Sequence, residues 1–478
     1  MLTRRGAMQT LIGAGAAPAV LRGARRKPGD KPNLLFLWTD EQRADTLAVN
    51  GNTTYRVPAL NRLASRSISF TRCYDTQPVC TPARCSVMTG LYPHTTGLTT
   101  NNIPLPPQVK AMPELLADSA YRTAYMGKWH LGDELFAQHG FEKWVSIEDG
   151  YNQHFTAGRD REKRSDYHHF LLSHGYQPEQ GNRFSRKFAV SRPPEHTKPA
   201  FLAAEASKFI LENRAGPWML YVNFLEPHMP FTGPYNDLHS EADAPLPRNY
   251  PGTPVEGEPE AYQRSRERFL KEGYDGHDLK TRAGWQRLNR NYAGLCTLVD
   301  QAAGRILWAL EASGQAENTI IVFTSDHGDM MGSHTLLTKS VLYEEAARVP
   351  LLLRVPFRNQ KPQRIDHPVS QIDLAPTLLD LMGARPAPGL PGQSLVPLVN
   401  GGALREDHVF IQWPEPASRA VVSPDGWKLA AFDSDNSMLF HLAADPLEMR
   451  NLYHRAEGAA ALRKLQAKLE AWRKRVNC

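Results

Sequence analysis

The chain has 478 residues, of which 41% are hydrophobic and 22% are charged, a composition typical of a folded protein with one large domain and a smaller one. Its net charge of +6 comes from basic residues that precede Asp30, a segment without any acidic residue. Because basic and acidic residues balance in the rest of the chain, the composition excludes a polyanion-binding surface there, and we expect no nucleic-acid partner.

The N-terminus is expected to be a targeting segment. Arg4 and Arg5 precede a mild apolar stretch, residues 7–21, that is too short to span a bilayer comfortably. Adjacent arginines before such a stretch resemble a twin-arginine signal, and Ala17 and Ala19 offer a small-residue cleavage site. We therefore expect export to the periplasm or the exterior, with no stable membrane span. An unstructured or membrane-anchoring N-terminus is the alternative.

Three unbroken apolar runs, at residues 33–39, 218–224 and 319–324, predict strands buried on both faces, as in a parallel α/β sheet. Acidic or histidine residues follow each run: Asp40 and Glu41, then Glu226 and His228, then Asp326 and His327. Ligand sites of open α/β sheets lie beyond the carboxyl ends of the strands. Carboxylates that converge there repel one another unless a cation lies between them, so a divalent metal is predicted; the alternative is that they cap neighbouring turns.

Helices are predicted between these strands. Periodic apolar positions indicate one over residues 199–211, with Thr197 as its N-cap, and another over residues 291–310. Two polar stretches, residues 150–194 and 236–280, predict long irregular loops. Such loops either line a site or are simply solvated.

The C-terminal part predicts a smaller unit. Pro, Gly and Leu become frequent around residues 384–397, and a basic amphipathic helix closes the chain at residues 459–475. Short strand-like pieces lie between them, at residues 408–412, 419–422, 427–432 and 438–441. We therefore expect a signal at residues 1–30, a catalytic domain at 31–395 and a small α+β subdomain at 396–478.

The string Cys80-Thr81-Pro82-Ala83-Arg84 suggests a nucleophile at a helix terminus. Proline favours the first position of a helix, so Cys80 would lie at the helix mouth, where free N–H groups and the macrodipole favour an anion. Arg84, one turn along, can point its guanidinium at the same place. The alternative is a buried thiol on an ordinary helix.

This string resembles the C-x-P-[SA]-R signature of type I sulfatases, in which the cysteine is converted before folding to formylglycine. Further strings match that family in the correct order, at residues 127–132, 227–230, 343–350 and 442–452, of which the string at 343–350 is expected to be structural. The resemblance implies an alkaline-phosphatase-like α/β fold, a mostly parallel sheet flanked by helices, with a smaller C-terminal antiparallel sheet plus helix. It also implies a formylglycine-generating enzyme as a partner during maturation.

The resemblance implies a divalent ion, usually calcium, held by Asp40, Glu41, Cys80 as formylglycine, Asp326 and His327. Glu41 stands where the family more commonly has aspartate. A nitrogen ligand from His327 is unusual for calcium, so magnesium and manganese remain alternatives.

The resemblance also implies catalytic roles. Lys128 and Lys339 would bind the sulfate, and Arg84 would stabilise the nucleophile's charge. His130 would bond the nucleophile's hydroxyl, and His228 would act as general acid to the leaving group. Strand-like spacing would place Lys128 and His130 on one face.

The predicted function is therefore hydrolysis of sulfate monoesters, with a sulfated small molecule or a sulfated carbohydrate as substrate. A phosphonate monoester or phosphodiester hydrolase is the nearest alternative, and a non-catalytic sulfated-glycan binder is an alternative of another class. Residues of the stretch 150–194, together with Asn101 and Asn102, are candidates for substrate selectivity.

Overall fold

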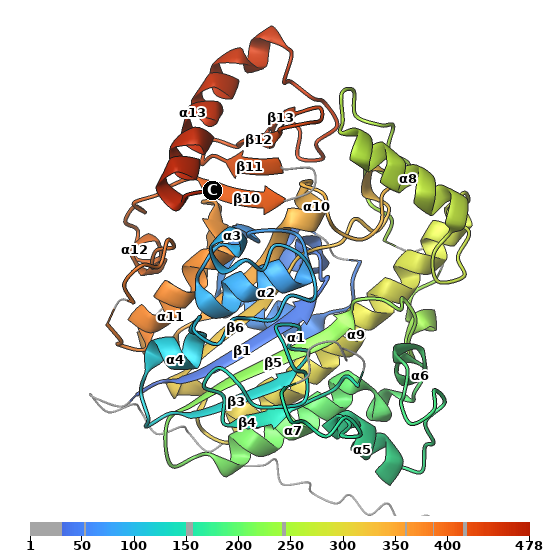
Figure 1. The fold of residues 1–478 in the computed structure, drawn as a ribbon, viewed down its shortest axis with the longest axis vertical. Coiled ribbons are helices and arrows are strands. Elements are labelled where there is room, and N and C mark those ends of the chain that lie inside the picture. The colour runs from blue at the N-terminus through green and yellow to red at the C-terminus, as the bar shows by residue number, and fades with distance from the viewer. Residues whose placement is uncertain are drawn as a thin grey trace, which may run out of the picture.

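The structure, a computed structural model, describes residues 31–51, 54–149, 156–240, 245–358, 361–385, 387–413 and 418–478 (Figure 1). The N-terminal segment with the predicted export signal lies outside the described residues, as do residues 150–155 of the first polar stretch. Within the described part of the chain, no helix combines the length and the apolar character needed to cross a membrane.

A nine-stranded sheet forms the centre of the molecule, in the order β4-β3-β5-β1-β6-β7-β2-β8, with β9 beside β2. Its strands are β1 (Asn33–Asp40), β2 (Ile68–Tyr74), β3 (Arg122–Gly127), β4 (Lys143–Val145), β5 (Trp218–Pro227), β6 (Thr319–Ser325), β7 (Arg348–Arg354), β8 (Gln363–Ile365) and β9 (Val369–Ser370). Only β7 is antiparallel to its neighbours, so the predicted mostly parallel sheet is confirmed. The three apolar runs are the central strands β5, β1 and β6.

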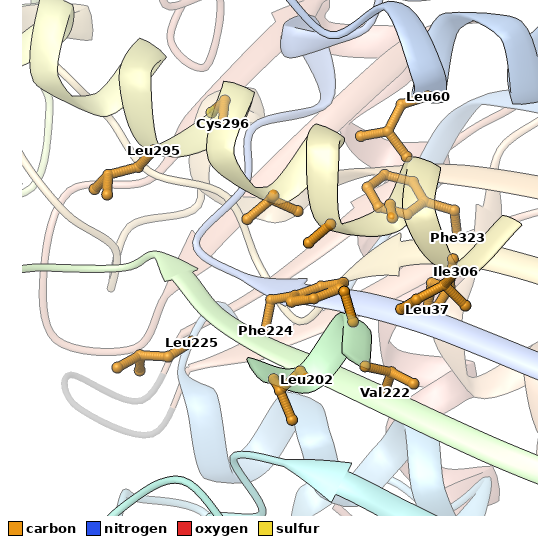
Figure 2. Close-up of a cluster of buried hydrophobic side chains, with 14 of the residues drawn as sticks. Leu37, Leu60, Leu202, Val222, Phe224, Leu225, Leu295, Cys296, Ile306 and Phe323 are labelled. Atoms are coloured by element: carbon orange, nitrogen blue, oxygen red, sulfur yellow. The ribbon is translucent and has the colours of Figure 1, made fainter. Parts of the chain in front are cut away.

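Both faces of this sheet are buried, and successive side chains of one strand enter different cores. Leu35 and Leu37 of β1 pack beneath α1 (Pro58–Ala64), α7 (Lys198–Glu212) and α9 (Arg282–Ala312), as Figure 2 shows for part of this cluster. Leu34 and Phe36 belong to the opposite core. That core includes residues of α2 (Cys80–Thr89), α4 (Met112–Leu116), α11 (Leu374–Leu381) and α12 (Val396–Val399). Burial on both faces explains why these strands are unbroken apolar runs.

The two predicted helices differ in detail from the observed ones. Thr197 occupies the predicted N-cap position of α7, but its hydroxyl donates to the carbonyl of Pro194 at 2.7 Å and does not accept a helix N–H. The second helix, α9, begins at Arg282, where the Thr281 hydroxyl accepts from the Gly284 N–H at 3.1 Å. Its first turns carry several charged residues between the apolar positions, which hides the periodicity there.

The prediction of wholly irregular loops in the two polar stretches is wrong. The first contains α5 (Asp166–Ser173) and α6 (Arg186–Val190), and the second contains α8 (Glu260–Glu272). Ser165 and Ser185 cap α5 and α6 by accepting backbone N–H groups, at 3.2 and 3.0 Å. α5 and α6 are short and α8 is highly charged, so these helices carry too few apolar positions for periodicity to reveal them.

A second, antiparallel sheet follows the main one in sequence, with the order β10-β11-β12-β13. Its elements are β10 (Val409–Trp413), β11 (Ser418–Val422), β12 (Trp427–Phe432), β13 (Met438–His441) and the helix α13 (Ala459–Val476), which covers it in Figure 1. Trp472 of α13 stacks on Phe410 with ring centroids 4.9 Å apart. The predicted C-terminal sheet plus helix is thus confirmed, whereas the domain boundaries remain a prediction. The short helices α3 (Pro93–Thr96) and α10 (Glu344–Ala347) lie in the loops between elements.

Candidate active site

The candidate site lies at the carboxyl edge of the main sheet, where β1 and β6 end side by side. Thr39 is in register with Ser325, so Asp40 and Asp326 follow at the same edge. Glu41 has a left-handed backbone (φ 64°), which turns the chain sharply away from β1. All these carboxylates are fully buried, as expected where charges are compensated by partners.

Arg84 of α2 bridges the two strand ends. Its Nη2 donates to Asp40 Oδ2 at 2.7 Å, and its Nε donates to Asp326 Oδ2 at 3.0 Å. Nη1 also donates to Asn223 Oδ1 of β5 at 3.0 Å, and the guanidinium lies 4.9 Å from the centre of the Trp38 ring. This buried guanidinium therefore fixes the end of α2 relative to three strands of the sheet.

Cys80 is the first residue of α2 and faces this cluster. Pro82 is the third helical residue, so its predicted place at the first position is wrong; the helix begins two residues earlier, with Val79 as the extended N-cap. The buried Sγ lies 3.2 Å from Lys339 Nζ and 3.3 Å from His327 Nε2. Burial and Asp40 raise the pKa of this thiol, but the nearby cations outweigh them and lower it below its usual value.

Four potential ligand atoms converge within 4.8 Å of one another, and they belong to Asp40, Cys80, Asp326 and His327. His327 Nδ1 donates to the carbonyl of Gly328 at 2.8 Å, which directs Nε2 at the cluster. Burial alone would lower the pKa of His327, yet Asp326 and Cys80 raise it to about 10, so the cluster favours positive charge at its centre. This donor set fits a divalent cation.

Glu41 is placed differently from the other predicted ligands. Its carboxylate groups with Asp40 and His228, and not with Asp326. Oε1 pairs with Lys339 and lies 3.5 Å from His228 Nε2, while the buried Oε2 has no hydrogen-bond partner among the described residues. Burial raises the pKa of Glu41 to about 7, so this carboxylate readily holds a proton.

Lys128 and His130 reach the site from the loop after β3. The predicted strand-like spacing of the two residues is wrong, because β3 ends at Gly127 and His130 has a left-handed backbone (φ 58°). The buried carboxylate of Glu134 holds this turn by accepting the N–H groups of Trp129 and His130, at 2.9 and 2.6 Å. Lys128 Nζ donates to Asp40 Oδ2 at 2.5 Å.

The surroundings of His130 and His228 favour the neutral form of both imidazoles. Burial lowers the pKa of His130 and of His228 well below the usual value, and nearby cations lower both further. His228 Nδ1 donates to the carbonyl of Met229 at 2.8 Å, which directs Nε2 towards Glu41.

Asn101 and Asn102, predicted to be selectivity residues, hold the site together. Asn102 Oδ1 lies 2.9 Å from His130 Nε2, and Asn101 Oδ1 accepts the N–H of Thr81 at 3.0 Å. The sequence analysis missed Glu134 and Asn223. A signal for Asn223 did exist, because it is a polar residue inside the apolar run of β5. No pattern distinguished Glu134 from an ordinary surface acid.

This fold and this edge cluster define an enzyme of the alkaline-phosphatase type. The family model "Sulfatase" matches residues 32–384, and the model "N-sulphoglucosamine sulphohydrolase, C-terminal" matches residues 332–475. The chain belongs to the sulfatase family, and it is a sulfuric ester hydrolase.

Relatives of known name span nearly the whole chain. An ulvan-active sulfatase from Formosa agariphila is 29% identical over 462 residues, which cover 92% of this chain and 80% of the relative. A choline-sulfatase from Rhizobium meliloti is 30% identical over 463 residues, which cover 93% of this chain and 86% of the relative.

Solved structures share the fold. One, in complex with its substrate D-glucosamine-2-N,6-O-disulfate, has a TM-score of 0.74 at 25% identity, covering 94% of this chain and 98% of that one. The phosphonate monoester hydrolase of Agrobacterium radiobacter has a TM-score of 0.76 at 23% identity, and the match covers 93% of this chain and 96% of that one. This likeness concerns the fold alone.

Proposed function

We propose that this enzyme hydrolyses sulfate monoesters with a formylglycine formed from Cys80 and a divalent metal. The observation that carries the proposal is the position of Cys80, buried at the first residue of α2 with Lys339, His327 and Asp40 around its Sγ. A formylglycine-generating enzyme would have to act on the chain before it folds, since Cys80 is only 1% exposed.

Cys80 Sγ stands in for a hydroxyl oxygen of the hydrated aldehyde that the modification would create. Such a hydrate supplies two hydroxyls, one to attack the sulfur of the ester and one whose deprotonation regenerates the aldehyde and expels sulfate. The surroundings of Sγ suit this replacement, because a cation and a histidine nitrogen lie within hydrogen-bonding distance. A thiolate has no second hydroxyl and could not regenerate in this way.

The metal would be held by Asp40, residue 80, Asp326 and His327, and Glu41 would be a peripheral ligand. When bound, the metal would act as a Lewis acid that stabilises negative charge on the nucleophile and on the sulfate oxygens. The residues as such support an oxygen-preferring divalent ion, with calcium the ion implied by the family and magnesium or manganese the alternatives.

Lys128 and Lys339 would bind the sulfate. Both ammonium groups lie at the cluster already, Lys128 on Asp40 and Lys339 on Glu41 and Cys80. Preorganised cations in a buried site stabilise the charge that develops on the equatorial oxygens at little reorganisation cost. The buried Arg84 would hold the carboxylates in place and lower the free energy of the nucleophile's anion.

His130 and His228 would move protons. A neutral His130 is in the state required of a base that deprotonates the second hydroxyl of residue 80. His228 would protonate the leaving alcohol, and its lowered pKa means that it must first gain a proton. The negative charge of a bound sulfate ester would favour the protonated form of His228, whose Nε2 lies 3.5 Å from Glu41 Oε1.

The substrate is proposed to be a sulfated carbohydrate or a sulfated small molecule, because the named relatives act on both kinds. Export through the twin-arginine route is proposed from Arg4 and Arg5. Lys128, Lys339 and His130 together match the sulfatase pocket of the family, so parallel assays with an aryl sulfate and an aryl phosphodiester should show a higher kcat/KM for the sulfate.

Mass analysis of the active protein tests the nucleophile. The peptide that contains residue 80 should be lighter than its unmodified form by the thiol-to-aldehyde difference, and Cys80→Ala should abolish sulfate release. Cys85→Ala, on the same helix, is the matched control and should remain active. Full activity of protein whose Cys80 is unmodified would refute the mechanism.

A further inference from the structure

A polar cavity of about 380 Å³ lies at the carboxyl end of β4. Its lining comes from residues 147–149, which follow β4, and from α5, α6 and the start of α7. Because β4 is parallel to β3, and β3 is parallel to β5, this cavity occupies the same sheet edge as Lys128 and His228. Its volume is in the range of small-ligand sites, ~300–1,000 Å³.

The lining carries three cationic side chains, Arg183, Arg186 and Lys198, and two carboxylates, Glu148 and Asp149. Arg186 donates to Glu148 Oε2 from Nε at 2.7 Å, and Lys198 pairs with Oε1 of the same carboxylate. Burial would raise the pKa of Glu148, but the two cations lower it to about 2, so the carboxylate is ionised. Both cations pair with Glu148, and Arg186 keeps 28% of its side chain exposed, so a ligand in the cavity can reach it.

The remaining lining suits a sugar that carries an anionic group. Arg183 adds a second guanidinium, and His168 is held by Asp149 at 2.8 Å. The ring of Phe184 lies 5.0 Å from that of His168 and supplies an apolar face among these polar groups. Arginine forks match carboxylate and sulfate-type oxygens with paired hydrogen bonds.

The cavity lies within electrostatic range of the reaction centre. Burial is the main cause of the lowered pKa of His130 and His228, and the positive charge of Arg186 contributes to both. Because the cavity lies at the same edge of the sheet as the reaction centre, one substrate could place its ester at residue 80 and a neighbouring group in the cavity.

We propose that this cavity, lined by Glu148, His168, Arg183, Arg186 and Lys198, binds a second anionic group of the substrate, a carboxylate or another sulfate on an acidic sulfated saccharide. This inference rests on the proposed function and names the substrate class of the same site. It predicts a preference for acidic sulfated saccharides over aryl sulfates that carry no second anionic group.

Matched substrates and variants test the inference. Sulfate release would be measured on a sulfated disaccharide with a uronate, on the same disaccharide with its carboxylate reduced to an alcohol, on a disulfated counterpart, and on an aryl sulfate. Arg183→Gln and Arg186→Gln should each lower kcat/KM for the substrates with a second anion by about 10-fold or more, the loss expected for a charged hydrogen bond. The change on the reduced disaccharide and the aryl sulfate should be about twofold or less.

Lys187→Gln is the matched control, because this exposed lysine of α6 carries the same charge outside the lining, and it should change none of these values. Binding of the uronate disaccharide to the unmodified Cys80 protein, measured by calorimetry, gives a readout that does not depend on turnover and should weaken in both arginine variants. Equal losses on all substrates with unchanged binding would overturn the inference. Absence of sulfate release from every ester, with binding still dependent on the arginines, would refute the proposed function and leave this inference standing.

Discussion

The cluster at the carboxyl edge of the sheet and the cluster around Lys428 are both buried sets of opposite charges, yet they differ in organisation. Lys428 of β12 pairs with Glu344 and Glu448 at 2.9 Å each, and Tyr74 donates to Glu344 at 3.1 Å. Its members come from β2, α10, β12 and the loop after β13, so they join the two sheets. The charges there only compensate one another.

At the sheet edge the charges surround a thiol, and the backbone around them is unusual. Glu41, His130, Thr338 and Ser340 all have left-handed conformations, at φ values of 64°, 58°, 63° and 73°. Non-glycine residues adopt this conformation at a cost, which persists where the surrounding structure imposes it and is concentrated at functional sites. Glu448 of the Lys428 cluster is left-handed as well, with a φ of 53°. The comparison therefore teaches that neither buried charge nor left-handed backbone identifies a site by itself, whereas a nucleophile among charges at a strand edge does.

Metal removal is expected to have the largest effect, and it should act on the edge cluster but not on the cluster around Lys428. Exhaustive chelation is expected to reduce sulfate release to background, because Asp40 and Asp326 would lose the cation that the proposed chemistry needs. The thermal midpoint should also fall, since a cation that binds only the folded state stabilises it. Adding back calcium, magnesium and manganese separately would rank the ions, and full activity after chelation would contradict the metal site.

Lys339→Ala tests whether the edge cluster serves catalysis. The loss of one preorganised cation should lower kcat/KM by about 1,000-fold. The variant frees Cys80 Sγ and Glu41, and stability should be largely retained because the released Glu41 carboxyl can take up a proton. Lys361→Ala, at an exposed lysine, is the control and should be as active as the natural protein. A large loss of stability with retained activity would show that Lys339 serves stability and not catalysis.

Lys428→Met tests whether the cluster around Lys428 serves stability and not catalysis. Removing one member of a buried ion pair leaves uncompensated charge and should lower the free energy of unfolding by about 3–5 kcal/mol, measured by urea denaturation. The kcat/KM of the folded fraction should stay unchanged. Lys464→Met, at a half-exposed surface pair, should have little effect on stability. Loss of kcat/KM in Lys428→Met without destabilisation would show that this cluster is not purely structural.

Much of the fold was predictable from sequence because burial on both faces leaves unbroken apolar runs. β1, β5 and β6 follow from that pattern, and the short strand-like pieces of the C-terminal part correspond to β10 to β13. The helices α5, α6 and α8 were missed because they are short or highly charged. Local side-chain caps such as Ser165 and Ser185, rather than long apolar faces, define where two of them begin.

The site was predictable where chemistry follows a strand or a family string, as at Asp40, Cys80 and Asp326. The reasoning failed where the backbone leaves regular structure: Lys128 and His130 were placed by strand spacing, but the strand has already ended. Glu134 was missed because its role lies in accepting two backbone N–H groups, which no residue pattern reveals.

Glu134→Ala should therefore impair the edge cluster without touching substrate. Two buried N–H groups would lose their acceptor and His130 would be free to leave its left-handed turn, so kcat/KM should fall by about 10- to 100-fold. Glu134→Gln retains one acceptor oxygen and should recover part of the activity. Glu142→Gln, at an exposed acid nearby, is the control. Equal activity of all three variants would remove Glu134 from the machinery that positions His130.

The smallest expected effect is the part of the pH dependence of stability that Glu448 of the Lys428 cluster contributes. Burial raises the pKa of Glu448 from 4.5 to about 8, so this acid binds its proton more tightly in the folded state than in the unfolded state. The stability that it contributes is fully present below pH 4.5 and is lost as the pH rises through 8. Between pH 6 and 9 the thermal midpoint of the natural protein should therefore fall further than that of Glu448→Gln, by about 2 °C for each kcal/mol involved. Glu457→Gln, half-exposed on the surface, should follow the natural protein at every pH, and parallel curves for all three proteins would show that the second cluster does not titrate in this range.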